Sequence, residues 1–266
     1  MKTKYLVFIL ISLLTFSLPL HGQDYRVIFV RGRVIADLAT RPVQTGDMLK
    51  SSSGLRFETQ EAVVIVISSQ GRRYTLKPAT AKKHEEKESL ELVKELLMPS
   101  RAYLSSRDDG SSQQDLFGFF RRESLAVTGD ELELPLDTLR FPDKPGSFFM
   151  LLCETGRQVC HLPLYRRQHS LLLRKPAQQA ACGNCPYQAV YVHQADTVFL
   201  GESSFTLSFP EKEELDAAIP PLIKALRQNG ADTLRILEEI SAFISECWGI
   251  PDPDNLRNFL QTHYLP

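Results

Sequence analysis

The chain has almost no excess charge of either sign: 31 lysine and arginine residues face 32 aspartate and glutamate residues, for a formal net charge of −1. Without a basic excess it has no long-range attraction for nucleic acid or for an anionic membrane surface. It also lacks the G-x-S-x-G, H-E-x-x-H and G-x-x-x-x-G-K-[ST] motifs. We therefore expect no nucleic-acid partner, no cofactor, and neither a hydrolase nor a nucleotide-binding protein.

The composition is otherwise that of a globular soluble protein, with 43% hydrophobic and 24% charged residues. A chain of 266 residues is long enough for one or two domains that each bury a core of their own. No internal repeat is evident. We expect two modest domains.

The most informative apolar stretch lies at the N-terminus. Lys2 and Lys4 precede an apolar run over 5–20, which is shorter than the roughly 20 residues that a spanning helix needs. This pattern predicts a secretory signal peptide over 1–22, cleaved before Gln23, and an exported protein that is periplasmic or extracellular. No cysteine follows the run, so a lipoprotein anchor is not expected. In the alternative, the signal stays uncleaved and tethers the protein to the membrane as an envelope sensor.

Residues 23–80 have the pattern of a small β domain. Runs of β-branched and aromatic residues over 25–30 and 62–67 are separated by Gly, Pro and Asp, which favour tight turns. The second run is continuously apolar and predicts a buried central strand. A compact antiparallel barrel or sandwich fits this spacing.

The order of motifs in this region resembles that of the FecR-like β domain. In that family a V-x-G-x-V strand is followed by a P-[LV]-x-x-G-D-x-L turn and later by an apolar strand. The matching segments are Val-Arg-Gly-Arg-Val at 30–34, Arg-Pro-Val at 41–43, Thr-Gly-Asp-Met-Leu at 45–49 and Gly-Arg-Arg-Tyr-Thr-Leu at 71–76. The anti-sigma segment of the FecR regulators is not found in this sequence. The resemblance therefore implies a β module that binds another molecule, and it does not extend to sigma-factor control.

A helix and a polar linker are expected over 81–124. Leu90, Val93 and Leu97 recur at helical spacing behind a charged start. Residues 105–114 contain no apolar side chain, which is typical of a linker.

A second β-rich region covers 125–210. Its candidate strands, each bounded by Gly, Pro or Asp, lie at 131–134, 147–153, 158–164, 170–173, 189–193 and 205–209. This spacing predicts an Ig-like antiparallel β sandwich, although the Cys-Trp-Cys signature is absent because the single tryptophan is Trp248. The fold class that we expect is therefore mainly β, with a helical C-terminal tail.

The tail, residues 211–266, has a helical pattern. Pro220 and Pro221 are expected to open a first helix. Asp232 is placed to cap a longer second helix, and Asp254 to cap a short third one. We expect these helices to dock against the β domain.

The sharpest candidate for chemistry is Cys182-Gly183-Asn184-Cys185. Two cysteines at this spacing can act as attacking and resolving thiols in a thiol-disulfide oxidoreductase. Such chemistry normally sits between a strand and a long helix, whereas Pro186 and a β-type run follow here. A structural cysteine pair is the favoured interpretation, and redox catalysis is the alternative.

Cys153 and Cys160 flank a predicted hairpin and would lie opposite each other on one face, at a spacing that a disulfide can bridge. The two cysteine pairs could instead form a four-thiolate zinc site, which we rank below disulfides because an exported protein meets oxidising conditions. Cys247 fits a buried small hydrophobe. His161, His169 and His193 lack the short spacing of metal ligands, so no metal site is predicted.

These observations predict an exported, non-enzymatic protein that binds another envelope protein through exposed sheet edges or apolar faces. The sequence alone does not identify that partner.

Overall fold

In the computed structural model the described residues are 24–37, 41–78, 116–155, 158–176, 185–194, 196–201 and 203–265. The chain divides into two compact units, Met1–Leu97 and Met98–Pro266, called unit 1 and unit 2. The expected signal peptide, the expected helix near residue 90 and the polar linker lie outside the described residues.

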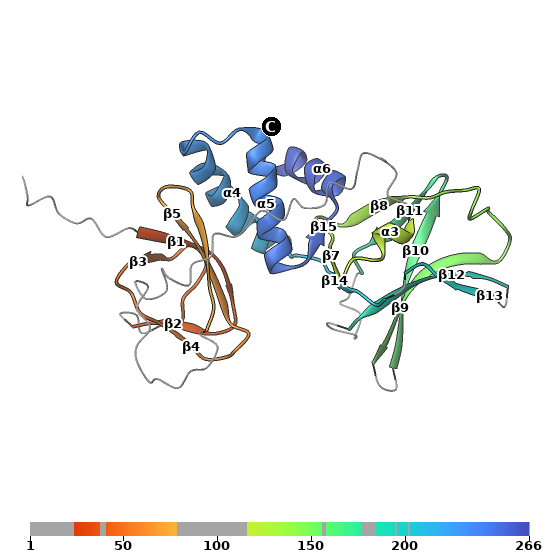
Figure 1. Cartoon of the computed structure of the whole chain (residues 1–266), viewed down its shortest axis with the longest axis horizontal. Coiled ribbons are helices and arrows are strands. Elements are labelled where there is room, and N and C mark those ends of the chain that lie inside the picture. Colours follow the sequence, from red (N-terminus) through yellow and green to blue (C-terminus); the bar gives the residue numbers. More distant parts are fainter. Residues whose placement is uncertain are drawn as a thin grey trace, which may run out of the picture. The chain divides into compact units, whose positions relative to one another are not determined.

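Unit 1 is built from two antiparallel sheets (Figure 1). Its strands are β1 (Asp24–Arg31), β2 (Val34–Ala36), β3 (Met48–Lys50), β4 (Leu55–Phe57), β5 (Val63–Ser68) and β6 (Arg73–Leu76). One sheet has the order β3-β1-β5-β6, and the other pairs β2 with β4. The continuously apolar run forms β5, which lies inside the larger sheet as predicted.

All six strands contribute to one core in unit 1. Tyr25, Val34, Leu55, Val66 and Leu76 are among its buried members. Tyr25 meets the ring of Tyr74 edge to face, with the ring centroids 5.6 Å apart. The short strands therefore close around a shared apolar interior, which is what a turn-rich β module of this size needs for stability.

Unit 2 contains a six-stranded antiparallel sheet and a smaller three-stranded sheet. Its strands are β7 (Ser124–Ala126), β8 (Glu131–Pro135), β9 (Ser147–Thr155), β10 (Gln158–Arg167), β11 (Ser170–Arg174), β12 (Tyr187–His193), β13 (Asp196–Phe199), β14 (Thr206–Ser208) and β15 (Ile250–Pro251). The larger sheet has the order β13-β12-β9-β10-β11-β8, and the smaller one β14-β7-β15.

Residues of both sheets share one core in unit 2. Leu125 and Val127 lie in a buried cluster with Phe149, Leu164 and Phe205, together with the short helix α3 (Leu116–Phe119). The prediction of a mainly β chain with C-terminal helices is confirmed. The smaller sheet departs from the expected antiparallel pairing, because β14 and β15 both run parallel to β7.

The helices of unit 2 are α4 (Lys212–Gln228), α5 (Thr233–Cys247) and α6 (Pro253–His263). The expected start of α4 at Pro220-Pro221 is wrong, since both prolines lie inside the helix. The buried stripe that includes Leu215, Ile219 and Leu222 continues through them, so apolar burial outweighs the cost of interior prolines.

The N-caps of α5 and α6 are aspartate residues whose carboxylates accept hydrogen bonds from backbone amides of the first turn. Asp232 caps α5 as predicted, accepting a hydrogen bond from the Arg235 amide over 2.8 Å. The predicted cap of α6 at Asp254 is wrong, because Asp252 accepts from the next amides and Pro253 takes the first helical position.

The tail is tied into the β structure by Asn255. Its side-chain oxygen accepts hydrogen bonds from the Thr128 amide over 3.1 Å and from the Thr128 hydroxyl over 2.7 Å. Its side-chain amide donates to the Glu131 carbonyl over 3.1 Å. The helices of 211–266 therefore belong to the same structural unit as the sheet. Among the described residues, no helix has the length and apolarity that crossing a membrane requires.

Candidate functional site

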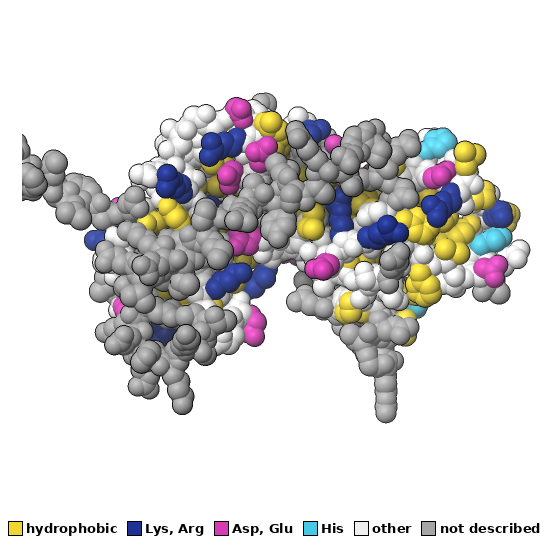
Figure 2. Space-filling model, viewed as in Figure 1, with side chains coloured by type: hydrophobic (Ala, Val, Ile, Leu, Met, Phe, Trp, Pro, Cys, Tyr) yellow, Lys and Arg dark blue, Asp and Glu magenta, His cyan; other side chains and the backbone are white. Residues whose placement is uncertain are grey.

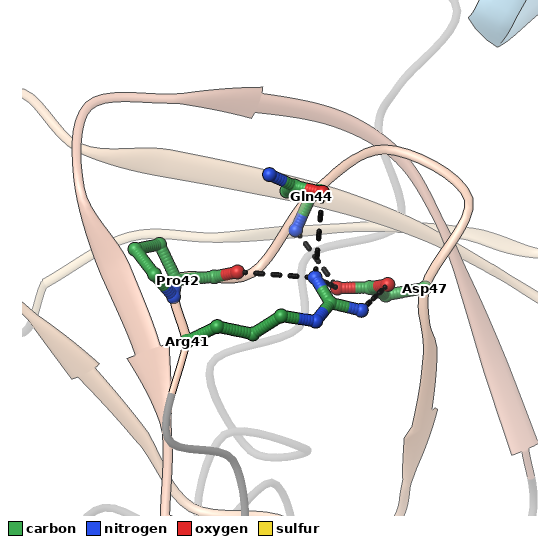
Figure 3. A network of polar contacts seen from close by, with 4 residues as sticks. All are labelled: Arg41, Pro42, Gln44 and Asp47. Atoms are coloured by element: carbon green, nitrogen blue, oxygen red, sulfur yellow. Dashed lines mark hydrogen bonds and ion pairs between the residues drawn. The ribbon is translucent and has the colours of Figure 1, made fainter.

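The turn over residues 41–47 is held by an internal polar network (Figure 3). The Arg41 guanidinium donates to both carboxylate oxygens of Asp47, over 3.1 and 2.6 Å, and the Gln44 amide donates to the same carboxylate over 2.9 Å. Gly46 has a φ of +96°, which L side chains rarely adopt. The motif residues therefore close the turn on itself.

Gly32, in the bend between β1 and β2, also serves the fold. Its φ is +74°, and a Cβ atom built there would lie 2.9 Å from the Cβ of Ala62. Only glycine permits both this conformation and this close approach of the two segments. Because the motif residues of unit 1 are explained by its folding, we place the candidate site in unit 2.

The Arg41–Asp47 pair leads to a pH prediction for unit 1. The hydrogen bond from Arg41 lowers the pKa of Asp47 below its usual range. The pair therefore stabilises unit 1 fully above the unfolded pKa of aspartate, about 3.9, and this contribution is lost as pH falls through the lowered folded value. In Asp47→Asn, the backbone amides of residues 41–50 should exchange faster at pH 7. The difference in their protection between pH 7 and pH 3 should also be smaller than in the unsubstituted protein. Because Arg41 is exposed, solvent screening keeps the effect small.

Segment-resolved hydrogen exchange at pH 7 and pH 3 measures this effect. Glu61→Gln, at an exposed position in the turn before β5, is the matched control and should leave the exchange of 41–50 unchanged. Equal exchange in Asp47→Asn and the unsubstituted protein at pH 7 would contradict the prediction.

The structure pairs the cysteines differently from the prediction. Cys153 forms a disulfide with Cys185, with Cα atoms 6.2 Å apart. Cys160 lies opposite Cys153 across β9 and β10, as the hairpin pattern predicted, and is itself disulfide-bonded. The predicted Cys153–Cys160 bond is nonetheless wrong, because Cys185 lies two residues before the start of β12, which flanks β9 on its other side.

This bond bears on the two alternative functions of the cysteines. Cys185 is 3% exposed and bonded to Cys153, so in this form it has no thiol that could act with Cys182 as a redox pair. Cys182 lies outside the described residues. The two bonded sulfurs are also not thiolates, which contradicts the four-cysteine zinc site. Cys247 is a buried thiol on α5, as expected of a small hydrophobe.

The three histidines of this region occupy different places. His161 lies on β10, His169 follows β10 in a turn, and His193 ends β12. Within the part of the chain that the structure describes, no three His, Cys, Asp or Glu side chains gather as they would around a metal ion.

The outer face of the six-stranded sheet is unusually apolar. Side chains alternate along β9, so Phe149 and Leu151 enter the core while Phe148 and Met150 point to the opposite face. Tyr165 of β10 also lies on this outer face, and it and Phe148 remain 48% and 47% exposed. In Figure 2, hydrophobic side chains gather on the visible surface of unit 2, among Lys, Arg and His side chains.

A groove of about 580 Å³ lies along β9 and β10. Its lining includes Phe148, Met150, His161, Pro163 and Tyr165. Its volume lies within the range of ligand pockets, roughly 300–1,000 Å³. The lining is mainly apolar and aromatic, so this outer-face groove is suited to bury hydrophobic side chains of a partner.

Both arginines beside the groove contact neighbouring residues, although the Nη1 atom of Arg166 is buried without a hydrogen-bond partner among the described residues. The Arg174 guanidinium lies 5.3 Å from the Tyr165 ring centroid and 3.5 Å from the Glu131 carboxylate. Arg166 donates to the Phe141 carbonyl over 2.9 Å. Arg174 therefore supports an aromatic wall of the groove and Arg166 anchors a neighbouring loop, and the recognition chemistry of the groove is mainly hydrophobic.

Sequence reasoning identified β9 and β10 but did not identify the groove. The signal was present in Ser147-Phe-Phe-Met-Leu-Leu-Cys153, which is apolar at consecutive positions. A strand that buries one face and exposes the other normally alternates apolar and polar residues. Continuous apolarity on both faces of the strand was the available clue.

No family model matches the chain, and no curated protein matches it. Among solved structures, the extracellular fragment of novel immune-type receptor 11 from Ictalurus punctatus, including its stalk region, is similar over 34% of this chain and 86% of that chain, with 9% identity and a TM-score of 0.23. A TM-score of this size carries no argument about function.

Proposed function

We propose that this chain is an exported, non-enzymatic binding protein whose unit 2 holds another envelope protein on the outer-face groove. Export is supported by the signal-like segment over 1–22 and by the Cys153–Cys185 disulfide, which persists in oxidising compartments. The FecR-like resemblance of unit 1 is consistent with an envelope binding module. The groove itself is the observation that carries the proposal.

The energetics of the groove favour protein binding. Phe148 and Tyr165 are each about half exposed, and burying a large apolar side chain contributes about 1.5–3 kcal/mol when it is complete. Aromatic side chains in a preformed hollow are frequent energetic centres of protein interfaces. Because each ring is already about half buried, a partner that covers both gains about 1.5–3 kcal/mol from them, which is part of the about 8 kcal/mol of a micromolar affinity.

Capture from native envelope extract tests this function. The mature chain is immobilised, and retained proteins are quantified for the unsubstituted protein and for Phe148→Ser/Tyr165→Ser. We expect a defined partner whose retention falls at least tenfold in the double variant, because the two half-exposed rings together contribute about 1.5–3 kcal/mol and about 1.4 kcal/mol corresponds to a tenfold change. Leu234→Ser is the matched control: Leu234 is 64% exposed but lies on α5, away from the groove, and its replacement should leave retention unchanged.

Fluorescence of Trp248 shows whether each variant is folded, because this is the single tryptophan and lies in unit 2. A folded protein that retains no envelope protein, or one that retains the same partner equally in the groove variant and the control, would overturn the proposal.

A further inference from the structure

The edge strand β13 is exposed, and the second half of it is apolar. Among the described residues it pairs only with β12, and it forms one margin of the six-stranded sheet (Figure 1). Val198 and Phe199 are 43% and 52% exposed. Natural proteins usually protect such an edge with charge, proline or a covering element, because its free backbone groups invite another strand.

The alternation of hydrogen bonds along β13 shows which of its backbone groups are available to pair with another strand. The Leu200 amide donates to the Ala189 carbonyl over 2.8 Å, so Leu200 bonds toward β12. Bonding direction alternates along an antiparallel strand, so Val198 also bonds toward β12. The N–H and C=O groups of Thr197 and Phe199 therefore point to the open edge.

The opposite edge of the sheet is protected. At β8, the Asn255 side chain bonds the Glu131 carbonyl, Glu131 and Glu133 are exposed charged residues, and Pro135 ends the strand. An open chain of molecules, joined from β13 of one to β8 of the next, is therefore disfavoured. The remaining possibility is that β13 of one molecule pairs with β13 of another. The two molecules are then related by a two-fold axis, and the assembly is complete as a dimer.

We infer that β13 pairs antiparallel with β13 of a second copy of this chain. The outward direction of the Thr197 and Phe199 backbone groups favours one register. In it, Thr197 of each copy lies opposite Phe199 of the other copy. Both of these pairs exchange backbone hydrogen bonds, and Val198 then lies on the two-fold axis opposite its own counterpart. The pairing is thus self-complementary without any change in the strand.

The apolar outer faces of the two copies become continuous in this register. Phe199 lies in line with Val190 and Met150, and Thr197 lies in line with Val192 and Phe148. Opposing Phe199 to Thr197 therefore joins these two rows across the axis and covers part of the exposed Phe199 ring. A net charge of −1 leaves little repulsion between copies. This continuity is why we favour a second copy over an unrelated strand as the occupant.

Sedimentation of the full mature chain over a concentration series tests the dimer. The paired strands are short, so the interface is smaller than a standard one and self-association should increase between about 1 and 500 μM. Thr197→Pro removes a donor that faces the open edge, not one used within the monomer, and should leave a folded monomer at every concentration. Leu234→Ser should dimerise like the unsubstituted chain. A monomer throughout for the unsubstituted chain, or an undiminished dimer in Thr197→Pro, would overturn the inference.

Cysteine cross-linking tests the register. Residue 198 is expected to oppose itself at close Cβ separation, so Val198→Cys should form an intermolecular disulfide under mild oxidation. Thr197→Cys opposes Phe199 of the second copy and should cross-link at least tenfold more slowly. Equal cross-linking of the two variants would exclude this register.

Discussion

Replacing both Cys153 and Cys185 by alanine is expected to lower the free energy of unfolding of unit 2 by about 3–4 kcal/mol. The bond joins residues that are 32 positions apart, and closing a loop of this length removes about that much chain entropy from the unfolded state. Cys153 is also 1% exposed within β9, so the loss falls inside the core and not at a frayed edge. We expect this to be the largest effect of any substitution considered for this protein.

Urea unfolding followed by Trp248 fluorescence measures the loss as a lower midpoint. Cys247→Ala is the control, because it removes a buried thiol without breaking a disulfide and should cost about 1 kcal/mol or less. Peptide mapping with free thiols alkylated before reduction checks the connectivity and identifies the partner of Cys160. An unchanged midpoint in the double variant would mean that the bond does not constrain unit 2.

Asn255→Ala is expected to destabilise unit 2 by about 2–4 kcal/mol. The substitution leaves the Thr128 amide and hydroxyl and the Glu131 carbonyl without this side chain. Thr128 is 1% exposed, so water cannot readily replace the lost partner, and an unsatisfied buried donor costs about 1–3 kcal/mol. The slightly better helix propensity of alanine offsets only a small part of this loss.

Asn258→Ala is the matched control for this prediction. Asn258 lies on the same helix, α6, and its side chain is exposed. The same chemical change there should alter stability by no more than about 0.5 kcal/mol. A double-mutant cycle between Asn255→Ala and Thr128→Val isolates the coupling of the two side chains. Additive effects in that cycle would show that their hydrogen bonds do not determine how α6 docks.

Local patterns predicted most of the strands of unit 2. The runs that became β8 to β12 are each rich in β-branched or long apolar residues and end at turn residues, so their positions could be read from neighbours in sequence. β13 was not predicted, because its four residues follow His193 closely and a turn separates them in which Gln194 has a φ of +55°. A non-glycine residue in this conformation leaves little mark on a sequence.

The cysteine pairing could not be read in the same way. Cys153 and Cys160 are close in sequence and do lie opposite each other, yet Cys153 bonds Cys185. The outcome depends on β12 being placed beside β9, with Tyr187 opposite Cys153. Strand order is a property of the whole sheet, and no spacing between cysteines encodes it.

The groove and the open edge illustrate the same limit. Periodicity shows that a strand has two apolar faces, but it does not show which face another element covers. Phe148 and Phe149 are identical neighbours in sequence, and only the assembled core distinguishes the buried ring from the exposed one. Candidate binding surfaces of this kind are therefore found from packing, after the strands have been placed.

The small parallel sheet determines which unit of the protein can finish folding first. β7 pairs with β15, and Thr128 is bonded to Asn255, 127 residues later in the chain. A polypeptide that emerges N-terminus first can close unit 1 early, whereas unit 2 must wait for almost its last segment before its two sheets and α6 can lock together. Even a short C-terminal truncation that removes α6 would therefore leave the outer-face groove on an unfinished domain.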